Sequence, residues 1–173
     1  MNLFRQQKCV NGLNSKFCAV LGAQWGDEGK GKLIDILAED YDVVTRFNGG
    51  ANAGHTIKVG EQKFFFHQVP SGILRPNIKN FIGNGCVISI FRMLDELKQL
   101  DKANVNWKNR LFISKNAHIT LEGHTEIENL FEQKLNIGTT KKGIGTTYAT
   151  KALRFGLRFE DLMDPSQFEI KYS

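Results

Sequence analysis

The sequence GDEGKGK, at residues 26–32, has the composition of a loop that binds phosphate. Glycines allow backbone N–H groups to turn toward an anion without obstruction, and Lys30 and Lys32 add full positive charge. The spacing fits the G-x-x-x-x-G-K part of a Walker A loop. Leu33, however, stands where that motif has the Ser or Thr that contacts the metal. The segment therefore predicts phosphate binding of a kind that differs from a simple P-loop protein.

Two acidic residues inside this loop, Asp27 and Glu28, indicate a further role. A carboxylate among phosphate-binding amides repels the ligand unless a cation bridges the two or the acid takes part in the chemistry. The alternative is an aspartate that caps the following helix on a glycine turn. The spacing alone leaves both interpretations open.

A second segment, NGGANAGHT at residues 48–56, is also rich in glycine. Its small residues permit close backbone approach to a ligand, Asn52 can bind a base or phosphate edge, and His55 can exchange a proton near neutral pH. A single histidine is more often structural. His55 follows Gly54 in a loop without an apolar stripe, which favours a functional role.

Alternating strand and helix patterns predict the elements that position these loops. Strands are expected at 17–21, 43–47, 64–69, 81–82, 86–89 and 111–114, and helices at 33–40, 93–100 and 127–135. This order predicts an α/β fold with a mostly parallel sheet, helices packed on it, and a P-loop-like phosphate loop after the first strand. Loops that follow parallel strands meet at the carboxyl edge of the sheet, where ligand sites of α/β proteins form. We therefore expect the two glycine-rich segments to lie together.

Composition excludes several classes of protein. Of the 173 residues, 41% are hydrophobic and 24% charged, as in ordinary globular domains, and the net charge of +5 is spread without a basic run. Nucleic-acid binding is therefore not expected. Three cysteines are too few for a disulfide framework or a zinc site, and no apolar stretch reaches the ~20 residues that span a bilayer. We expect a polar extension at 1–16 that is no secretory signal, one nucleotide-binding domain at 17–173, and a cytoplasmic location.

Several motifs together resemble the adenylosuccinate synthetase family. They are QWGDEGKGK (24–32), NAGHT (52–56), HQVPSGIL (67–74), IGNG (82–85), IGTTKKGIG (137–145) and KALRFGLR (151–158). The resemblance runs from about Phe17 to the end of the chain. It implies a GTP-dependent ligase of purine biosynthesis that joins L-aspartate to IMP through a 6-phosphoryl-IMP intermediate, with Mg²⁺ as cofactor, giving adenylosuccinate, GDP and phosphate.

The resemblance also assigns roles to residues. Asp27 matches the base that takes the proton from the hypoxanthine ring, and His55 matches the residue that stabilises charge on the transferred phosphoryl group. Mg²⁺ would bind Asp27 and the backbone carbonyl of Gly54. Residues implied to contact GTP are Gly26, Asp27, Glu28, Gly29, Lys30, Gly31, Lys32, Gly54, His55 and Thr56. Residues implied to contact IMP are Asp27, Glu28, Gly29, Lys30, Asn52, Ala53, Gly54, His55, Thr140 and Arg154, the last reaching across a homodimer to the partner's site.

The chain departs from the family pattern at a few places. Asn48 stands where the family often has Gln, Thr146 replaces a common Pro, and the chain has well under half of the family's usual length. The segments implied to bind guanine and aspartate therefore fall outside these residues.

Three other interpretations of the sequence are open. One is a shortened purine-nucleotide-binding module without catalysis. A second is a phage-type relative that uses a guanylate, which is disfavoured because such relatives are expected to alter the residue at Asp27. A third, a generic P-loop GTPase, is disfavoured by Leu33 and by the lack of an N-K-x-D tetrapeptide.

Overall fold

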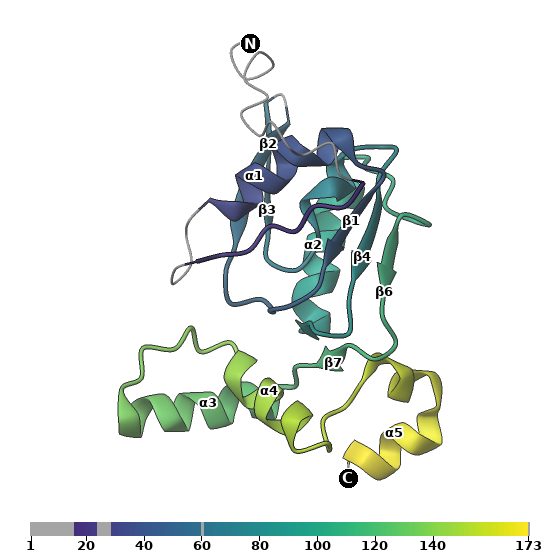
Figure 1. Cartoon of the computed structure of the whole chain (residues 1–173). Helices are drawn as coiled ribbons and strands as arrows, with labels where there is room; N and C mark the ends of the chain where they lie inside the picture. The colour runs from purple at the N-terminus through teal and green to yellow at the C-terminus, as the bar shows by residue number, and fades with distance from the viewer. Residues whose placement is uncertain (1–15, 24–28, 60, 173) are drawn as a thin grey trace.

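The structure is a computed structural model that describes residues 16–23, 29–59 and 61–172 (Figure 1). Its centre is a parallel sheet of three strands in the order β1-β4-β6, formed by Val43–Arg46, Lys79–Ile82 and Leu111–Ile113. The register aligns Arg46 with Ile82 and Ile82 with Ile113, so all three strands end at one edge. The predicted α/β class with a parallel sheet is confirmed.

Two smaller sheets extend this centre. Strands β2 (His55–Val59) and β3 (Gln62–Phe66) form an antiparallel hairpin, and β5 (Val87–Ile88) pairs in parallel with β7 (His118–Ile119). The strand at β2 was not predicted, because its first residues were interpreted as a glycine-rich loop. Gly60 and Glu61 separate two runs of β-branched and aromatic residues, and a glycine-first pair of this kind is typical of a tight hairpin.

The described residues also form five α-helices and three short 3₁₀ helices, in two groups. Near the sheet lie α1 (Lys30–Leu37), η1 (Ala38–Asp40), η2 (Ser71–Leu74) and α2 (Ile90–Lys102). Helices α3 (Glu122–Leu135), α4 (Ile144–Ala152) and α5 (Pro165–Tyr172), with η3 (Phe159–Met163), gather beyond β7 at one end of the molecule (Figure 1). The three predicted helices correspond to α1 with η1, α2 and α3.

The core lies between α2, the hairpin and the parallel sheet. Helix α2 turns Met93 and Leu100 inward at helical spacing, and they join Phe66, Ile73 and Ile82 in one apolar cluster. Phe66, Ile73 and Leu100 are completely buried. This cluster fixes the hairpin against the parallel sheet, and thereby the first residue of β2.

Helices α3 and α4 are joined by polar contacts. The backbone N–H of Gly143 donates to the buried carboxylate of Glu128 at 2.7 Å, and the Thr146 hydroxyl donates to the His124 carbonyl at 2.8 Å. A proline at position 146 could not make the second bond. The Thr146 departure therefore adds a link between the two helices.

The predicted strand at 17–21 is wrong for this structure. Residues 17–23 are assigned to no strand, and Phe17 and Leu21 are 81% and 72% exposed. A short apolar run becomes a buried strand only where a neighbouring strand pairs with it and other elements cover its faces. In the described residues β1 is an edge strand of the sheet, and no further strand lies beside it.

Gly85 packs closely against the backbone of Phe47. A Cβ atom at this position would overlap the carbonyl oxygen of Phe47, which is backbone and cannot rotate away. We expect Gly85→Ala to destabilise the chain by at least about 2 kcal/mol in urea unfolding, because overpacking against backbone forces the two loops apart.

Gly123 provides the matched control for that variant. It lies in α3 with no atom within 4 Å of a Cβ placed there, so Gly123→Ala should stabilise the chain by about 0.5–1 kcal/mol. Equal unfolding midpoints for Gly85→Ala and the parent chain would contradict the close approach of the two loops.

Candidate functional site

His55 is the residue around which the candidate site is built. It begins β2 opposite Phe66, whose ring meets the imidazole edge-on with centroids 6.2 Å apart. Its Nε2 lies 3.0 Å from the hydroxyl of Ser71 in η2. The predicted loop position of His55 is therefore wrong in detail: the residue is held on a strand by an aromatic ring and a hydroxyl.

The first turn of α1 packs directly against His55. A Cβ atom at Gly31 would come within 2.9 Å of both Cβ and Cγ of His55, so only glycine permits this approach. Gly29 precedes the helix in the left-handed conformation, with φ of 81°, and its carbonyl accepts from the N–H groups of Lys32 and Leu33. The end of the predicted phosphate segment thus lies beside the end of the second glycine-rich segment.

Arg46, the last residue of β1, binds the backbone of the second glycine-rich segment, residues 48–56. Its guanidinium donates to the carbonyls of Gly50 at 2.5 Å and Asn48 at 3.3 Å, and also to that of His67. Three carbonyls from two loops converge on one rigid donor group, which orients both loops.

Tyr148 of α4 connects the same segment to the lower helices. Its hydroxyl accepts from the N–H of Gly49 at 2.9 Å and lies 2.8 Å from both Asn48 Oδ1 and the Gly85 carbonyl. Asn48, one of the departures from the family pattern, therefore has a defined partner in this chain.

Gly54 is close-packed against two rings. A Cβ atom there would lie 2.7 Å from Cζ of Phe65 and 2.9 Å from Nε2 of His67. The rings of Phe65 and His67 themselves pack edge-to-face, with centroids 4.6 Å apart. Any larger residue at position 54 would displace the backbone that leads into His55.

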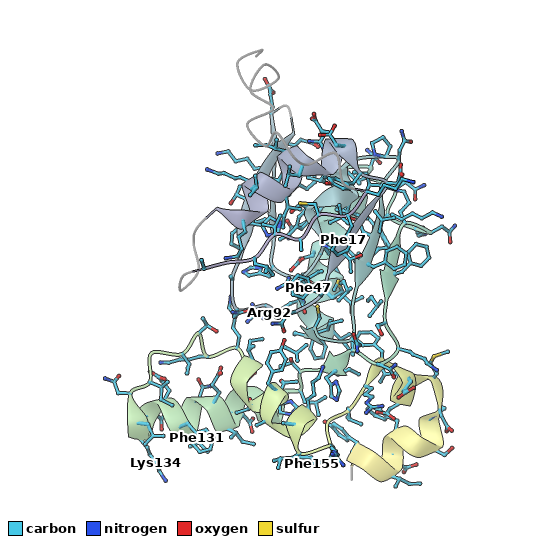
Figure 2. The ribbon with its side chains drawn as sticks, in the orientation of Figure 1. Phe17, Phe47, Arg92, Phe131, Lys134 and Phe155 are labelled. Atoms are coloured by element: carbon cyan, nitrogen blue, oxygen red, sulfur yellow. The ribbon has the colours of Figure 1, made fainter. Side chains whose placement is uncertain are left out.

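The electrostatic environment of the site is cationic. Burial lowers the pKa of His55, and the charges of Arg46 and His67 lower it further, against a smaller opposite effect of Asp35. Burial likewise lowers the pKa of His67, with contributions from Lys142 and Arg92. Figure 2 shows Arg92 between the sheet and helices α3 and α4. These shifts favour the neutral form of both imidazoles, and the cations Arg46, Arg92 and Lys142 near them attract an anion.

The structure brings most of the predicted site residues together. Asn52, Ala53 and Gly54 are exposed and lead into His55, which α1 contacts through Gly31. The described part of this group comprises Gly29, Lys30, Gly31, Lys32, Asn52, Ala53, Gly54, His55 and Thr56. Gly26, Asp27 and Glu28 lie outside the described residues.

Thr140 and Arg154 are both exposed and belong to segments other than the two glycine-rich ones. The segment that carries Thr140 approaches the second loop through Lys142, whose ammonium donates to the Ala51 carbonyl at 2.8 Å. Arg154 is exposed just after α4, in the left-handed region with φ of 69°.

Several residues of the site were missed from the sequence. They are Arg46, Ser71, Glu96, Lys142 and Tyr148, all of which act through contacts distant in the chain. For Arg46 a signal exists: a lone cation inside the apolar run VVTRF at a strand's carboxyl end. In the residues that the structure describes, no group of three or more His, Cys, Asp or Glu side chains could hold a metal ion.

Acid should destabilise the chain, since all four of its histidines have a pKa lowered mainly by burial: His55, His67, His118 and His124. As the pH falls, the histidines of the unfolded chain bind protons near pH 6.5, whereas those of the folded chain bind them only at lower pH. Stability is complete above about pH 6.5 and falls below it, by at most about 1.4 kcal/mol per pH unit for each histidine. Urea unfolding at pH 7.5 and 5.5, at equal ionic strength, measures the loss. Equal stability at both values would show that these imidazoles are not buried neutral.

A model of one protein family covers nearly all of this chain. The adenylosuccinate synthetase model matches residues 19–173. The chain belongs to the adenylosuccinate synthetase family.

Sequence relatives carry the same family name. An adenylosuccinate synthetase of Paramecium tetraurelia is 55% identical over 168 residues, which is 95% of this chain and 39% of the relative. One of Phaeodactylum tricornutum is 51% identical over 156 residues, or 88% of this chain and 30% of the relative. This chain therefore spans well under half of the length of these synthetases.

Solved structures agree with the family. The fully ligated adenylosuccinate synthetase of Plasmodium falciparum matches with a TM-score of 0.78 and 45% identity, over 88% of this chain and 36% of that one. The succinoaminodeoxyadenylate synthetase of cyanophage S-2L, bound to dGMP and dATP as an energy donor, matches with a TM-score of 0.62 and 28% identity over 76% of this chain and 36% of that one. The Plasmodium falciparum match is the stronger in TM-score, in sequence identity and in the share of this chain covered.

Two further observations concern the described residues. None of their helices is long and apolar enough to cross a membrane. Two small surface hollows lie away from His55, one at the turn after α2 and one lined by His124, Thr150 and Leu157.

Proposed function

We propose that this chain supplies the phosphoryl-transfer part of an adenylosuccinate synthetase, the GTP-dependent ligase that joins L-aspartate to IMP. The observation that carries the proposal is the contact of Gly31 with His55, which brings the two glycine-rich segments together in a chain of this family. Helix α1 then presents its N-terminal end to the same space as His55, and helix N-termini bind phosphate.

The proposed reaction has two steps. The carboxylate of Asp27 takes the proton from the ring N–H of IMP, and the 6-oxygen attacks the γ-phosphorus of GTP, so that GDP leaves. The amine of L-aspartate then attacks C6, and the C–O bond breaks to release phosphate and adenylosuccinate. Both steps depend on positioning and on neutralising oxygen charge, which the cationic surroundings of His55 supply.

His55 is proposed to stabilise the transferred phosphoryl group. Burial and the charge of Arg46 lower the pKa of His55, which favours the neutral ring, and this ring keeps one N–H that can donate to a phosphoryl oxygen. Phe66 and Ser71 restrict the ring's orientation. The residues matched to GTP and IMP contacts by the family resemblance remain predictions, including Thr140 and Arg154.

Mg²⁺ would be held by the Asp27 carboxylate and the Gly54 carbonyl, with phosphate oxygens of the substrate completing its coordination. Two oxygen donors from the protein suit this ion, which usually keeps few protein ligands. The exposed and tightly packed backbone at Gly54 is compatible with that role, because no side chain can cover its carbonyl from position 54. The ion would neutralise phosphate charge. The chain would hold the Asp27 carboxylate and the Gly54 carbonyl in place to bind it.

A homodimer is proposed through the exposed apolar face of α3. Ile127, Leu130, Phe131 and Leu135 recur at helical spacing and are all exposed, and Phe155 is exposed after α4 (Figure 2). Arg154 lies next to Phe155, so a second copy on this face would receive its guanidinium. Sedimentation velocity should give twice the chain's 19.5 kDa mass; a monomer at all concentrations would contradict the dimer. A cytoplasmic location stays a prediction.

The test of the function is formation of adenylosuccinate. Because the chain spans 39% of the Paramecium relative, residues 17–173 should replace the corresponding segment of that synthetase in a chimera. With IMP, GTP, L-aspartate and Mg²⁺ we expect product at a rate within about tenfold of the parent relative. A folded chimera that binds GTP but forms no product would refute the proposal, and would favour a nucleotide-binding module without catalysis.

A further inference from the structure

Glu96 is a buried acid whose carboxylate binds three successive backbone N–H groups. It lies on the inward face of α2 and is 3% exposed. Oε1 accepts from the N–H of His67 at 3.0 Å, Oε2 accepts from that of Val69 at 2.9 Å, and the N–H of Gln68 lies 3.1 and 3.2 Å from the two oxygens. A carboxylate in an apolar core is costly unless such donors compensate it, so this arrangement has a specific structural effect.

The effect is to fix the turn that follows β3. Gln68 adds a second attachment to α2, since its amide exchanges hydrogen bonds with the backbone of Ser89 at 2.8 and 3.0 Å. Arg46 binds the carbonyl of His67 from the opposite side. Residues 67–69 are therefore held between α2 and the carboxyl end of β1.

Both ends of this turn lead to the proposed site. At its start, Nδ1 of His67 lies 3.7 Å from Glu96 Oε1, while its Nε2 faces Gly54. Past its end, after Pro70, the hydroxyl of Ser71 lies 3.0 Å from Nε2 of His55. Displacement of the turn would move a neighbour of Gly54 and the hydrogen-bond partner of His55 together.

We propose that Glu96 is a positioning residue for His55, acting through the 67–71 turn and the Ser71 hydroxyl. The inference rests on the proposed function for its effect on turnover, while its structural part concerns this chain alone. Glu96 lies on α2, and its carboxylate accepts from the backbone of residues 67–69 and not from His55 or the glycine-rich segments in the described residues, so its action is indirect.

The Glu96→Gln variant tests the structural part. The amide keeps the size of the carboxylate but turns an NH₂ donor toward backbone donors, so the turn should detach from α2. In NMR spectra of the 173-residue chain we expect the NOE between the His55 ring and the Ser71 β-protons to be lost. Glu128→Gln is the matched control: Glu128 is also buried and accepts a backbone N–H, from Gly143, but on α3. That variant should keep the NOE.

Kinetics of the chimera test the functional part. We expect Glu96→Gln to lower kcat by about 10- to 100-fold with little change in the KM for IMP, the range found for residues that orient a site residue. Ser71→Ala should lower kcat by a similar factor. The double variant should have the same kcat as the less active of the two single variants, because both substitutions remove the same interaction with His55. A purely structural role for Glu96 would instead give multiplying effects.

The outcomes separate the inference from the proposed function. An unchanged His55–Ser71 NOE in Glu96→Gln, or multiplying losses of kcat, would overturn the inference even in an active chimera. Without activity in the parent chimera the proposed function fails, and the NOE still decides the positioning role. If Glu96→Gln does not fold, Glu96→Asp takes its place. The shorter side chain moves the carboxylate away from the backbone of residues 67–69, so the NOE should again be lost. In either case Ser71→Ala alone must lower kcat.

Discussion

Replacing Asp27 by Asn is expected to lower phosphoryl transfer to IMP by at least about 1,000-fold while IMP binding is largely kept. A carboxylate can take the ring proton from IMP, whereas the amide of nearly the same size cannot accept it, and positioned general bases contribute about 10²–10⁴ to a rate. The chimera provides the assay: steady-state product formation for turnover, and calorimetric titration with IMP for binding.

Glu28→Gln is the control for charge at this loop. It removes one negative charge next to Asp27 without removing the proposed base, so it should retain far more activity than Asp27→Asn. Full activity in Asp27→Asn would refute the assignment of the base and would leave Asp27 as a helix-capping residue, the other interpretation of its place in the loop.

Replacing His55 by Gln is expected to lower kcat by about 100- to 1,000-fold. The loss corresponds to removal of one preorganised donor to the transferred phosphoryl group. Gln retains a donor at a similar distance from the backbone but lacks the ring that packs on Phe66 and next to Gly31, so it cannot be held in the same orientation. The measurement is kcat and the KM for IMP in the chimera.

His124→Gln is the control for loss of a buried imidazole. His124 is buried between α3 and α4, where its Nδ1 accepts from the Leu121 N–H at 2.9 Å, away from His55. We expect it to lower the unfolding midpoint without a comparable loss of kcat. Equal kinetic losses in the two variants would mean that His55 contributes only stability.

Much of the fold could be predicted from the sequence because its signals are local. Helix α2 has apolar residues at helical spacing, and β1 is an apolar run between polar segments. The strand at 17–21 has the same local signal and fails: no strand is assigned at 17–23, although β1 is an edge strand in the described residues, so the local pattern alone does not decide whether a run pairs. Strand β2 was missed for the opposite reason. The glycine-rich segment before it and at its start predicts a loop, but residues 55–59 pair with β3 one by one.

The residues of the candidate site also fall into two groups, those that the sequence identifies and those that only the structure shows. Glycine spacing and residue type identify the segments around Gly31 and His55, and the structure confirms that these two residues touch. The groups that orient them could not be read from spacing. Glu96 acts on a turn 27–29 residues earlier, and Tyr148 reaches Gly49 across 99 residues, so their roles follow from tertiary packing alone.

The central claim is that GTP phosphorylates IMP at this site before aspartate reacts, and positional isotope exchange tests it most directly. GTP labelled with ¹⁸O in its β,γ-bridge is incubated with the chimera, Mg²⁺ and IMP, without aspartate. If the γ-phosphoryl group moves reversibly to IMP, the β-phosphate of GDP rotates and label appears in nonbridging positions of recovered GTP. We predict exchange that requires IMP and vanishes in Asp27→Asn. Exchange that survives in Asp27→Asn, or its absence in a chimera that makes adenylosuccinate, would contradict the account.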